Sequence, residues 1–198
     1  MKFTSENFYL VGAGGYGKQL EYMLKQNKII SSAKFADDKL KFKIKNFLKT
    51  NKKIYFNITI ANMKIRESIY NLSKKKNLVY TTLTLPNCNI YSKKIGKGSI
   101  IEHNTLISNN VSIGLGNFIF TGTTIAHNTS IGNFCNVGCN VVISGNVNIG
   151  KKVNIGGQSF ISNHLNICNN VIITPGSVVL SDIKKPGIYN GNAVIKLF

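Results

Sequence analysis

The stretch "IGKGSIIEHNTLISNNVSIGLGNF", residues 95–118, decides the fold, because it divides into four consecutive six-residue units. The same unit continues without a slip to residue 178 and gives fourteen hexads, each beginning with Ile or Val. A β-branched residue at every sixth position suits short strands that stack identical side chains inward. The repeat therefore predicts a parallel β-helix.

The other hexad positions indicate how each coil turns. The fourth position is Gly or Asn in ten of the fourteen hexads, and these residues tolerate a positive φ, so we expect a tight corner there. Gly96, Gly114, Gly132 and Gly150 are spaced by 18 residues, which indicates three hexads per coil. Fourteen hexads then predict between four and five coils.

Residues 7–80 follow a different pattern. "FYLVGAGGYGKQLEYML", residues 8–24, is a short apolar strand, a glycine turn and a helical pattern, and Gly12, Gly14 and Gly17 fit G-x-G-x-x-G. A strand at 53–61, a helix at 62–76 and a strand at 78–85 complete a Rossmann-like βαβαβ unit. Such a turn either binds a phosphate at the helix N-terminus or is a tight turn without a ligand.

The two patterns predict two domains. We expect an α/β Rossmann-like domain over residues 1–84 and a β-helix over residues 85–198, with a C-terminal tail. Asp37 and Asp38 follow the glycine turn by about 20 residues, where an acidic residue can hold a ribose hydroxyl.

Composition excludes several classes of function. The net charge is +18, which favours polyanionic ligands, although 24 of the 25 basic residues are Lys, as expected of an A·T-rich genome. No aromatic–basic nucleic-acid motif accompanies the lysines, so we expect no nucleic-acid partner.

No apolar run reaches 18 residues and no signal peptide precedes the first strand, so we expect a cytoplasmic protein without a membrane partner. The four cysteines form no C-x-x-C pair, and we expect no metal.

Four segments together resemble the NeuD/PglD-like family of sugar O- and N-acyltransferases. They are "YLVGAGGYGK" at 9–18, "ANMKIR" at 61–66, "IAHNTSIGNFCNVGCNVVISGNVNIG" at 125–150 and "PGIYNGNAVIK" at 186–196. The resemblance covers nearly the whole chain. It implies a left-handed β-helix, acetyl-CoA as co-substrate, and a homotrimer with active sites at the subunit boundaries.

The resemblance also separates two histidines. The family's catalytic histidine precedes a "GNV.IG" segment by 18 residues, and "GNVNIG" begins here at Gly145, which selects His127 as general base. His103 lies 24 residues before His127, one coil plus one side, and so falls on another face. The family's Asp or Glu after the histidine is replaced by Asn128, which is either a turn residue or an acceptor that fixes the imidazole tautomer.

Further site residues are carried over by the same resemblance. Those expected to hold the sugar nucleotide are Gly14, Gly15, Tyr16, Asp37, Asp38 and Ala61. Those expected to hold acetyl-CoA are Asn136, Gly145, Gly157 and Pro175. Tyr16 stands where the family often has a histidine, and Pro175 replaces a glycine and cannot donate a backbone N–H.

The resemblance implies acetyl transfer to the amino group of a nucleotide-linked amino-deoxysugar, in surface-glycan biosynthesis. The nucleotide (UDP, dTDP or GDP) stays open, and O-acetylation of a sialic acid or another sugar is the close alternative. A structural β-helix without activity is the non-enzyme alternative, but it leaves the glycine turn unexplained. A γ-type carbonic anhydrase is disfavoured, because His103, His127 and His164 lack the spacing of its metal ligands.

Overall fold

The computed structural model describes residues 3, 6–39, 43–75 and 77–191. The chain divides into two compact units, Met1–Leu85 and Pro86–Phe198. Residues 192–196, which end the segment "PGIYNGNAVIK", lie outside the described residues. No helix in the described part of the chain is long and apolar enough to cross a membrane.

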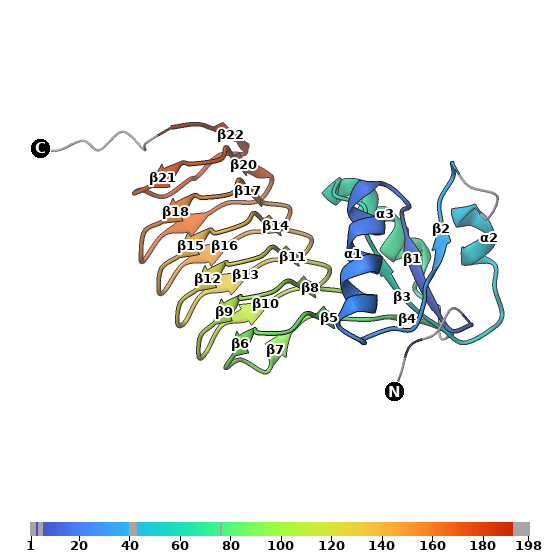
Figure 1. Ribbon diagram of the computed structural model, residues 1–198. Coiled ribbons are helices and arrows are strands. Elements are labelled where there is room, and N and C mark those ends of the chain that lie inside the picture. Colours follow the sequence, from blue (N-terminus) through green and yellow to red (C-terminus); the bar gives the residue numbers. More distant parts are fainter. Residues whose placement is uncertain (1–2, 4–5, 40–42, 76, 192–198) are drawn as a thin grey trace, which may run out of the picture. The chain divides into compact units, whose positions relative to one another are not determined.

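The N-terminal unit is built on a parallel four-stranded sheet with the order β2-β1-β3-β4 (Figure 1). Along the chain its elements are β1 (Phe8–Val11), α1 (Gly15–Gln26), β2 (Lys34–Ala36), α2 (Ile44–Leu48), β3 (Ile54–Ile58), α3 (Met63–Leu72) and β4 (Leu78–Tyr80). The sequence predicts neither β2 nor α2. These elements have 3 and 5 residues, too few for a periodic pattern to stand out.

Alternating strand residues and two helices make the core of this sheet. Tyr9, Phe56 and Tyr80 point to the face where Phe47 of α2 and Ile69 of α3 pack. Helix α1 buries Leu20 and Leu24 completely. The sheet is thus covered by apolar side chains, while its carboxyl edge is formed by the loops that follow each strand.

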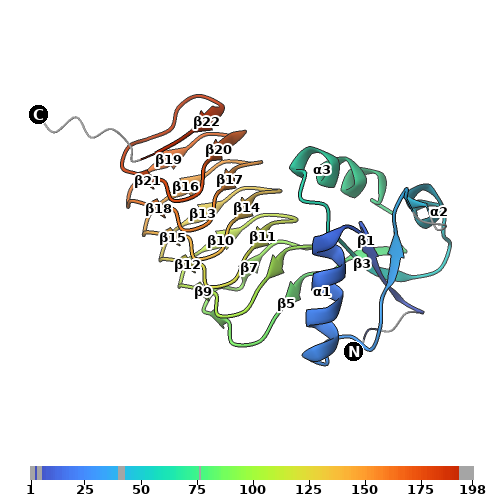
Figure 2. The same cartoon turned by 45° about the horizontal axis from the view of Figure 1, so that its top comes forward.

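The second unit is a parallel solenoid of stacked coils, as the hexads predict (Figures 1 and 2). The seven-stranded sheet, which includes β5 from the last residues before the unit boundary, has the order β22 (Gly187–Tyr189), β20 (Val171–Ile173), β17 (Asn154–Ile155), β14 (Asn136–Val137), β11 (Phe118–Ile119), β8 (Ile100–Ile101), β5 (Leu83–Thr84). The six-stranded sheet has the order β21 (Val178–Val179), β18 (Phe160–Ile161), β15 (Val142–Ile143), β12 (Thr124–Ile125), β9 (Leu106–Ile107), β6 (Asn89–Ile90). The five-stranded sheet has the order β19 (Asn166–Ile167), β16 (Asn148–Ile149), β13 (Ser130–Ile131), β10 (Ser112–Ile113), β7 (Lys94–Ile95).

The prediction of three hexads per coil is confirmed. Stacked residues are 18 apart, as in Ile125 on Ile143, and the first-position Ile and Val side chains are buried along the solenoid interior. The fourth position also behaves as predicted, since all fourteen such residues have positive φ, from Asn140 at 55° to Gly122 at 73°. Even Phe134, Lys152, Gln158 and His164 adopt this conformation.

The predicted number of coils is wrong, because the sheets hold five, seven and six strands, which makes about six coils. The additional strands do not keep the hexad register. Val171 pairs with Gly187, only 16 residues later, and β6 ends 5 residues before Ile95. Counting hexads therefore misses the first and last coils.

Three corners join the sheets and are named here by one residue each. The Pro175 corner, between the seven- and six-stranded sheets, stacks His103, Thr121, Cys139, Gly157 and Pro175. The His127 corner, between the six- and five-stranded sheets, stacks His127, Gly145 and Asn163. The Gly132 corner, between the five- and seven-stranded sheets, stacks Gly96, Gly114, Gly132 and Gly150.

Candidate active site

The glycine turn after β1 is held from three sides. Gly12 has φ of 114°, donates its N–H to the carbonyl of Ala36 (2.9 Å) and accepts from the hydroxyl of Thr59 (2.6 Å). A Cβ on Gly17 would lie 2.2 Å from the Gly12 oxygen, so α1 packs directly on the turn. The first and third glycines of G-x-G-x-x-G are thus required by the backbone itself.

Gly14 and Gly15 differ from these two, because a Cβ on either would meet nothing within 4 Å. Both are exposed, and α1 begins at Gly15 with no acidic residue in its first turn. The free N–H groups and positive dipole end of a helix attract phosphate. The open side of this turn therefore suits an anion, and Tyr16 lies in the same helical turn.

Asp37, at the end of β2, braces the glycine turn. Its Oδ2 accepts from the Ala13 N–H (2.7 Å) and its Oδ1 from the Lys39 N–H (2.8 Å). These hydrogen bonds lower the pKa of Asp37 below its ordinary value of 3.8, and the bond from the Ala13 N–H has the largest effect. Asp38 is exposed and accepts from the Ile44 N–H (3.2 Å). Asp37 thus has a structural task that its spacing from the turn did not reveal.

The loop after β3 is positioned by Arg66, a residue that the sequence did not single out for function. The guanidinium is fully buried and donates to the carbonyls of Ile60 (2.8 Å) and Ala61 (3.2 Å). Asn62 caps α3 by accepting from the Lys64 and Ile65 N–H groups (both 3.1 Å). The signal that could have found Arg66 is composition, since it is the single arginine of the chain.

These loops meet at one edge of the sheet. The glycine turn follows β1, Asp37 and Asp38 follow β2, and Ala61 follows β3. In the order β2-β1-β3-β4 all strands are parallel, but β2 is added on one side of β1 whereas β3 and β4 are added on the other, so the strand order reverses between β1 and β3. Ligands of open parallel sheets bind at the carboxyl ends of strands beside such a reversal. The structure therefore gathers the six residues predicted for the sugar nucleotide at one edge.

At the His127 corner, the imidazole lies against Gly145. A Cβ on Gly145 would sit 2.7 Å from Cε1 and 2.8 Å from Nε2 of His127, and φ of Gly145 is not positive. Glycine is therefore required here for space rather than for backbone conformation. His127 is exposed, Gly145 is buried beneath it, and among the described residues the Gly145 N–H has no acceptor.

Asn128 contacts the same imidazole. It occupies the fourth hexad position with φ of 57°, and its Nδ2 lies 3.2 Å from Nδ1 of His127. Asn128 is thus a turn residue, as the first alternative from the sequence has it, and it also contacts the histidine. In the hydrogen-bond arrangement of this structure, however, the amide nitrogen and not the carbonyl oxygen faces Nδ1.

The other two histidines lie elsewhere on the solenoid. His103 follows β8 of the seven-stranded sheet and belongs to the Pro175 corner, so it faces away from the His127 corner. His164 is an exposed fourth-position residue with φ of 59°. Among the described residues, no group of three or more His, Cys, Asp or Glu side chains could hold a metal.

The predicted acetyl-CoA residues do not all join His127. Gly145 does, whereas Gly157 and Pro175 stack at the Pro175 corner, where the Gly176 N–H donates to the Gly157 carbonyl (2.9 Å). Asn136 lies on the seven-stranded sheet, is only 8% exposed, and donates to Asn154 Oδ1 (3.2 Å). Within one chain, the two halves of the predicted acetyl-transfer site lie on separate corners.

Cys135 and Cys139 differ in their surroundings. Cys135 is fully buried in the solenoid interior, where it packs in the core. Cys139 is exposed at the Pro175 corner, where partial burial and the Glu102 carboxylate raise the pKa of its thiol. The thiolate, which is the nucleophilic form, is thereby disfavoured.

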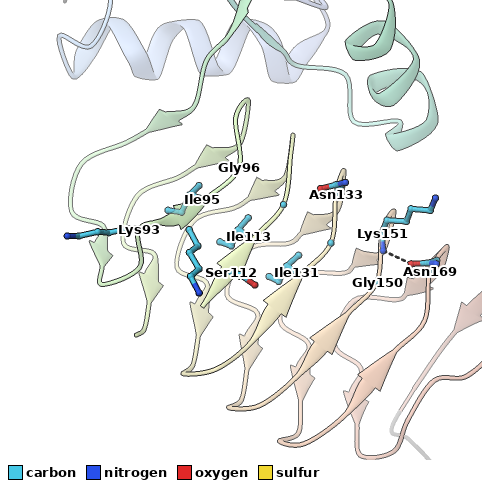
Figure 3. Close-up of a pocket in the computed structure, with 13 residues that line it drawn as sticks. Lys93, Ile95, Gly96, Ser112, Ile113, Ile131, Asn133, Gly150, Lys151 and Asn169 are labelled. Atoms are coloured by element: carbon cyan, nitrogen blue, oxygen red, sulfur yellow. Dashed lines mark hydrogen bonds between the residues drawn. The ribbon is translucent and has the colours of Figure 1, made fainter. Parts of the chain in front are cut away.

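A groove of about 650 Å³ lies at the Gly132 corner (Figure 3). Lys93, Lys94 and Lys151 line it, and the oxygens of Asn133 and Asn169 are taken by the N–H groups of Leu115 and Lys151 (both 2.8 Å). Its lining is therefore basic and rich in donors. None of the residues predicted for the site lies in this groove.

No protein-family model and no curated protein sequence matches this chain. Solved structures do. The acetyltransferase domain of PglB from Neisseria gonorrhoeae FA1090 is 20% identical with a TM-score of 0.85, covering 94% of this chain and 97% of that domain. It has also been solved in complex with acetyl coenzyme A.

Two further structures cover the chain to a similar extent. PerB from Caulobacter crescentus, solved in complex with CoA and GDP-perosamine, is 17% identical with a TM-score of 0.81 over 93% of this chain and 94% of its own. WeeI from Acinetobacter baumannii AYE is 22% identical with a TM-score of 0.80 over 92% and 93%. The chain thus shares the fold of these proteins, in agreement with the family resemblance of its sequence.

We expect Asp37→Asn to lower the melting temperature of the protein at pH 7, followed by the helical circular-dichroism signal. The reason is that a neutral amide is a weaker acceptor than a carboxylate for the N–H groups of Ala13 and Lys39. The pKa of Asp37 is lower in the folded state than its ordinary value of 3.8. The carboxylate therefore stabilises the folded protein fully above pH 3.8, and this stabilisation is lost as the pH falls through the pKa of the folded state. The difference from wild type should therefore shrink below pH 3.8.

The matched control is Asp38→Asn, whose carboxylate accepts a longer bond of 3.2 Å from Ile44. A smaller effect is expected there. A loss of equal size from both variants, or a loss from Asp37→Asn that persists unchanged at low pH, would contradict the bracing role of Asp37.

Proposed function

We propose that this protein is an acetyltransferase that moves acetyl from acetyl-CoA to the amino group of a nucleotide-linked amino-deoxysugar, for surface-glycan biosynthesis. The observation that carries the proposal is the seating of the exposed His127 imidazole on Gly145. Support also comes from the shared fold, since PglB and PerB have been solved with acetyl-CoA and with CoA plus GDP-perosamine.

In the proposed mechanism His127 is the general base. The substrate amine attacks the thioester carbonyl, a C–N bond forms, and the imidazole takes the amine proton. The Gly145 N–H, which lacks an acceptor among the described residues, would donate to the tetrahedral oxyanion. The C–S bond then breaks, and the imidazolium returns the proton to the CoA thiolate. No covalent enzyme intermediate is needed, in keeping with the raised pKa of Cys139.

The nucleotide-sugar would bind at the carboxyl edge of the four-stranded sheet. Its phosphates would meet the backbone of Gly14 and Gly15 at the start of α1, beside Tyr16, where there is open space. Ala61, held by Arg66, would form the other wall, and the exposed Asp38, whose Oδ1 accepts from Ile44, would accept from a ribose hydroxyl. Asp37 would act by keeping the turn in shape.

Acetyl-CoA would require a second copy of the chain. Asn136, Gly157 and Pro175 lie on the seven-stranded sheet and its corner, away from His127 in the same chain. A homotrimer with active sites at its boundaries would bring the Pro175 corner of one copy to the His127 corner of the next. Such a site would explain why neither corner alone holds all the predicted residues.

The outer face of the six-stranded sheet is the apolar surface that we assign to the trimer. Val142 and Phe160 stack there and are 40% and 38% exposed. The five-stranded sheet instead carries polar Ser130, Asn148 and Asn166 at the equivalent positions. Phe118 and Phe120 do not belong to this surface, because Phe118 lies on the seven-stranded sheet and is fully buried against the partly buried Phe120.

We expect wild-type protein to scatter light with three times the 21.8 kDa mass of the chain. Phe160→Glu should lower this mass and the activity together, because it places a charge in the apolar face. Asn148→Glu, on the five-stranded sheet, is the matched control and should leave the mass unchanged. A fully active monomer would refute a shared site.

Titration calorimetry should detect binding of a UDP-, dTDP- or GDP-linked amino sugar. Gly14→Val should abolish this binding without lowering the melting temperature, since Gly14 has an extended backbone and open space around its Cα. Gly14→Ala, which adds only a methyl group, should bind with reduced affinity. Tight binding of NAD together with no response to any sugar nucleotide would rule out this assignment.

Loss of the base should separate the two histidines. His127→Ala should lose ~10²–10⁴-fold in kcat, the usual contribution of general-base catalysis, while still binding both substrates. His103→Ala should stay near wild type, because His103 lies at the opposite end of the Pro175 corner from Gly157 and Pro175, the residues predicted to hold acetyl-CoA. Equal losses from both variants, or an active His127→Ala enzyme, would show that His127 is only a repeat residue.

A further inference from the structure

Asn128 donates to two partners at once. Its Nδ2 lies 3.2 Å from Nδ1 of His127 and 3.2 Å from Oδ1 of Asn146. An –NH₂ group has two protons and can serve both acceptors. In this arrangement Nδ1 of the neutral imidazole accepts, so its proton is on Nε2.

This tautomer is the wrong one for a base. Asn128 occupies Nδ1, so Nε2 is the nitrogen that an amine could reach on the exposed ring. A nitrogen that already carries a proton cannot accept another. Catalysis therefore needs the proton on Nδ1, which must then donate to an oxygen. A half-turn of the Asn128 amide places Oδ1 at the position now held by Nδ2.

That half-turn cannot occur alone. With Oδ1 of Asn128 facing Oδ1 of Asn146, two acceptors would oppose each other, so the Asn146 amide must turn as well and present its Nδ2. The Asn146 amide can turn without breaking another hydrogen bond, because its Nδ2 has no acceptor in the described part of the chain. The two amides therefore turn together.

The backbone keeps these three side chains in register. Asn128 and Asn146 are stacked fourth-position residues with φ of 57° and 59°. The Asn146 N–H donates to the His127 carbonyl (3.0 Å), and the ring is seated on Gly145. Only the direction of the amide–amide bond is then left to vary.

We propose that Asn146 is a positioning residue: the direction of its hydrogen bond with Asn128 selects the tautomer of His127 and thereby sets whether Nε2 can accept a proton. The proposal rests on the proposed role of His127 as base. It assigns a task to a residue that touches neither the ring nor the proposed substrate.

Two aspartate substitutions test this coupling, because a carboxylate can only accept. Asn128→Asp presents an oxygen to Nδ1 and should place the proton there. Asn146→Asp holds the Asn128 –NH₂ toward itself and toward Nδ1, and should keep the proton on Nε2. Both add one negative charge at stacked positions of the His127 corner, where the backbone conformation tolerates Asp. A purely electrostatic effect would shift both variants in the same direction, whereas the proposed coupling shifts them in opposite directions.

The primary readout is ¹⁵N NMR of the imidazole nitrogens in the ligand-free protein, at a pH where the ring is neutral. The His127 signals are assigned by their loss in His127→Ala. Asn170→Asp is the matched control, because Asn170 is also a fourth-position residue with φ of 59° but lies at the Gly132 corner. This variant should keep the wild-type tautomer of His127. The same tautomer in Asn128→Asp and Asn146→Asp would overturn the proposal.

Rates then test the proposed function separately. Asn146→Asp should lose about 10-fold in kcat, the scale of one charge-assisted hydrogen bond. Asn128→Asp should retain a kcat well above that of Asn146→Asp and should move the acidic limb of the pH–rate profile to higher pH. Opposite tautomers with unchanged rates would leave the amide coupling intact and instead refute His127 as the base.

Discussion

The solenoid depends on one backbone constraint, a left-handed conformation at every sixth residue. The fourteen fourth-position residues all have φ between 55° and 73°, and each turns the chain into the next short strand. Three such corners bring the chain back above its starting point after 18 residues. A left-handed conformation costs roughly 1–2 kcal/mol for a residue with a Cβ, so the frequent Gly and Asn reduce a cost that recurs in every coil.

Because the coil length is fixed, position in the sequence becomes position on a corner. His127 lies over Gly145, and Asn128 over Asn146, since each pair is 18 residues apart. His103, offset by 24 residues, falls on the next corner. The repeat therefore placed His127 and His103 on different corners from the sequence alone, whereas the choice of His127 as the base came from the family resemblance. It also placed Gly157 and Pro175 in one column.

What the sequence could not supply depends on contacts made across elements. Asp37 has the spacing of a ribose-binding carboxylate, but its bond to the Ala13 N–H exists only once β2 pairs with β1. Phe118 occupies an outward-facing strand position, yet it is fully buried, which periodicity alone does not predict. The end coils break the hexad register, so Gly187 on Val171 could not be found by counting.

The glycines show why one residue type has different meanings in this chain. Gly12 is required for its φ of 114°, and Gly17 because a Cβ there would lie 2.2 Å from the Gly12 oxygen. Gly145 is required because the ring of His127 occupies the space of a Cβ. None of these three reasons applies to Gly14 or Gly15, since a Cβ on either would lie in open space. A glycine that neither the backbone nor packing requires is best explained by something outside the chain. In a turn at a helix N-terminus, that favours a bound phosphate.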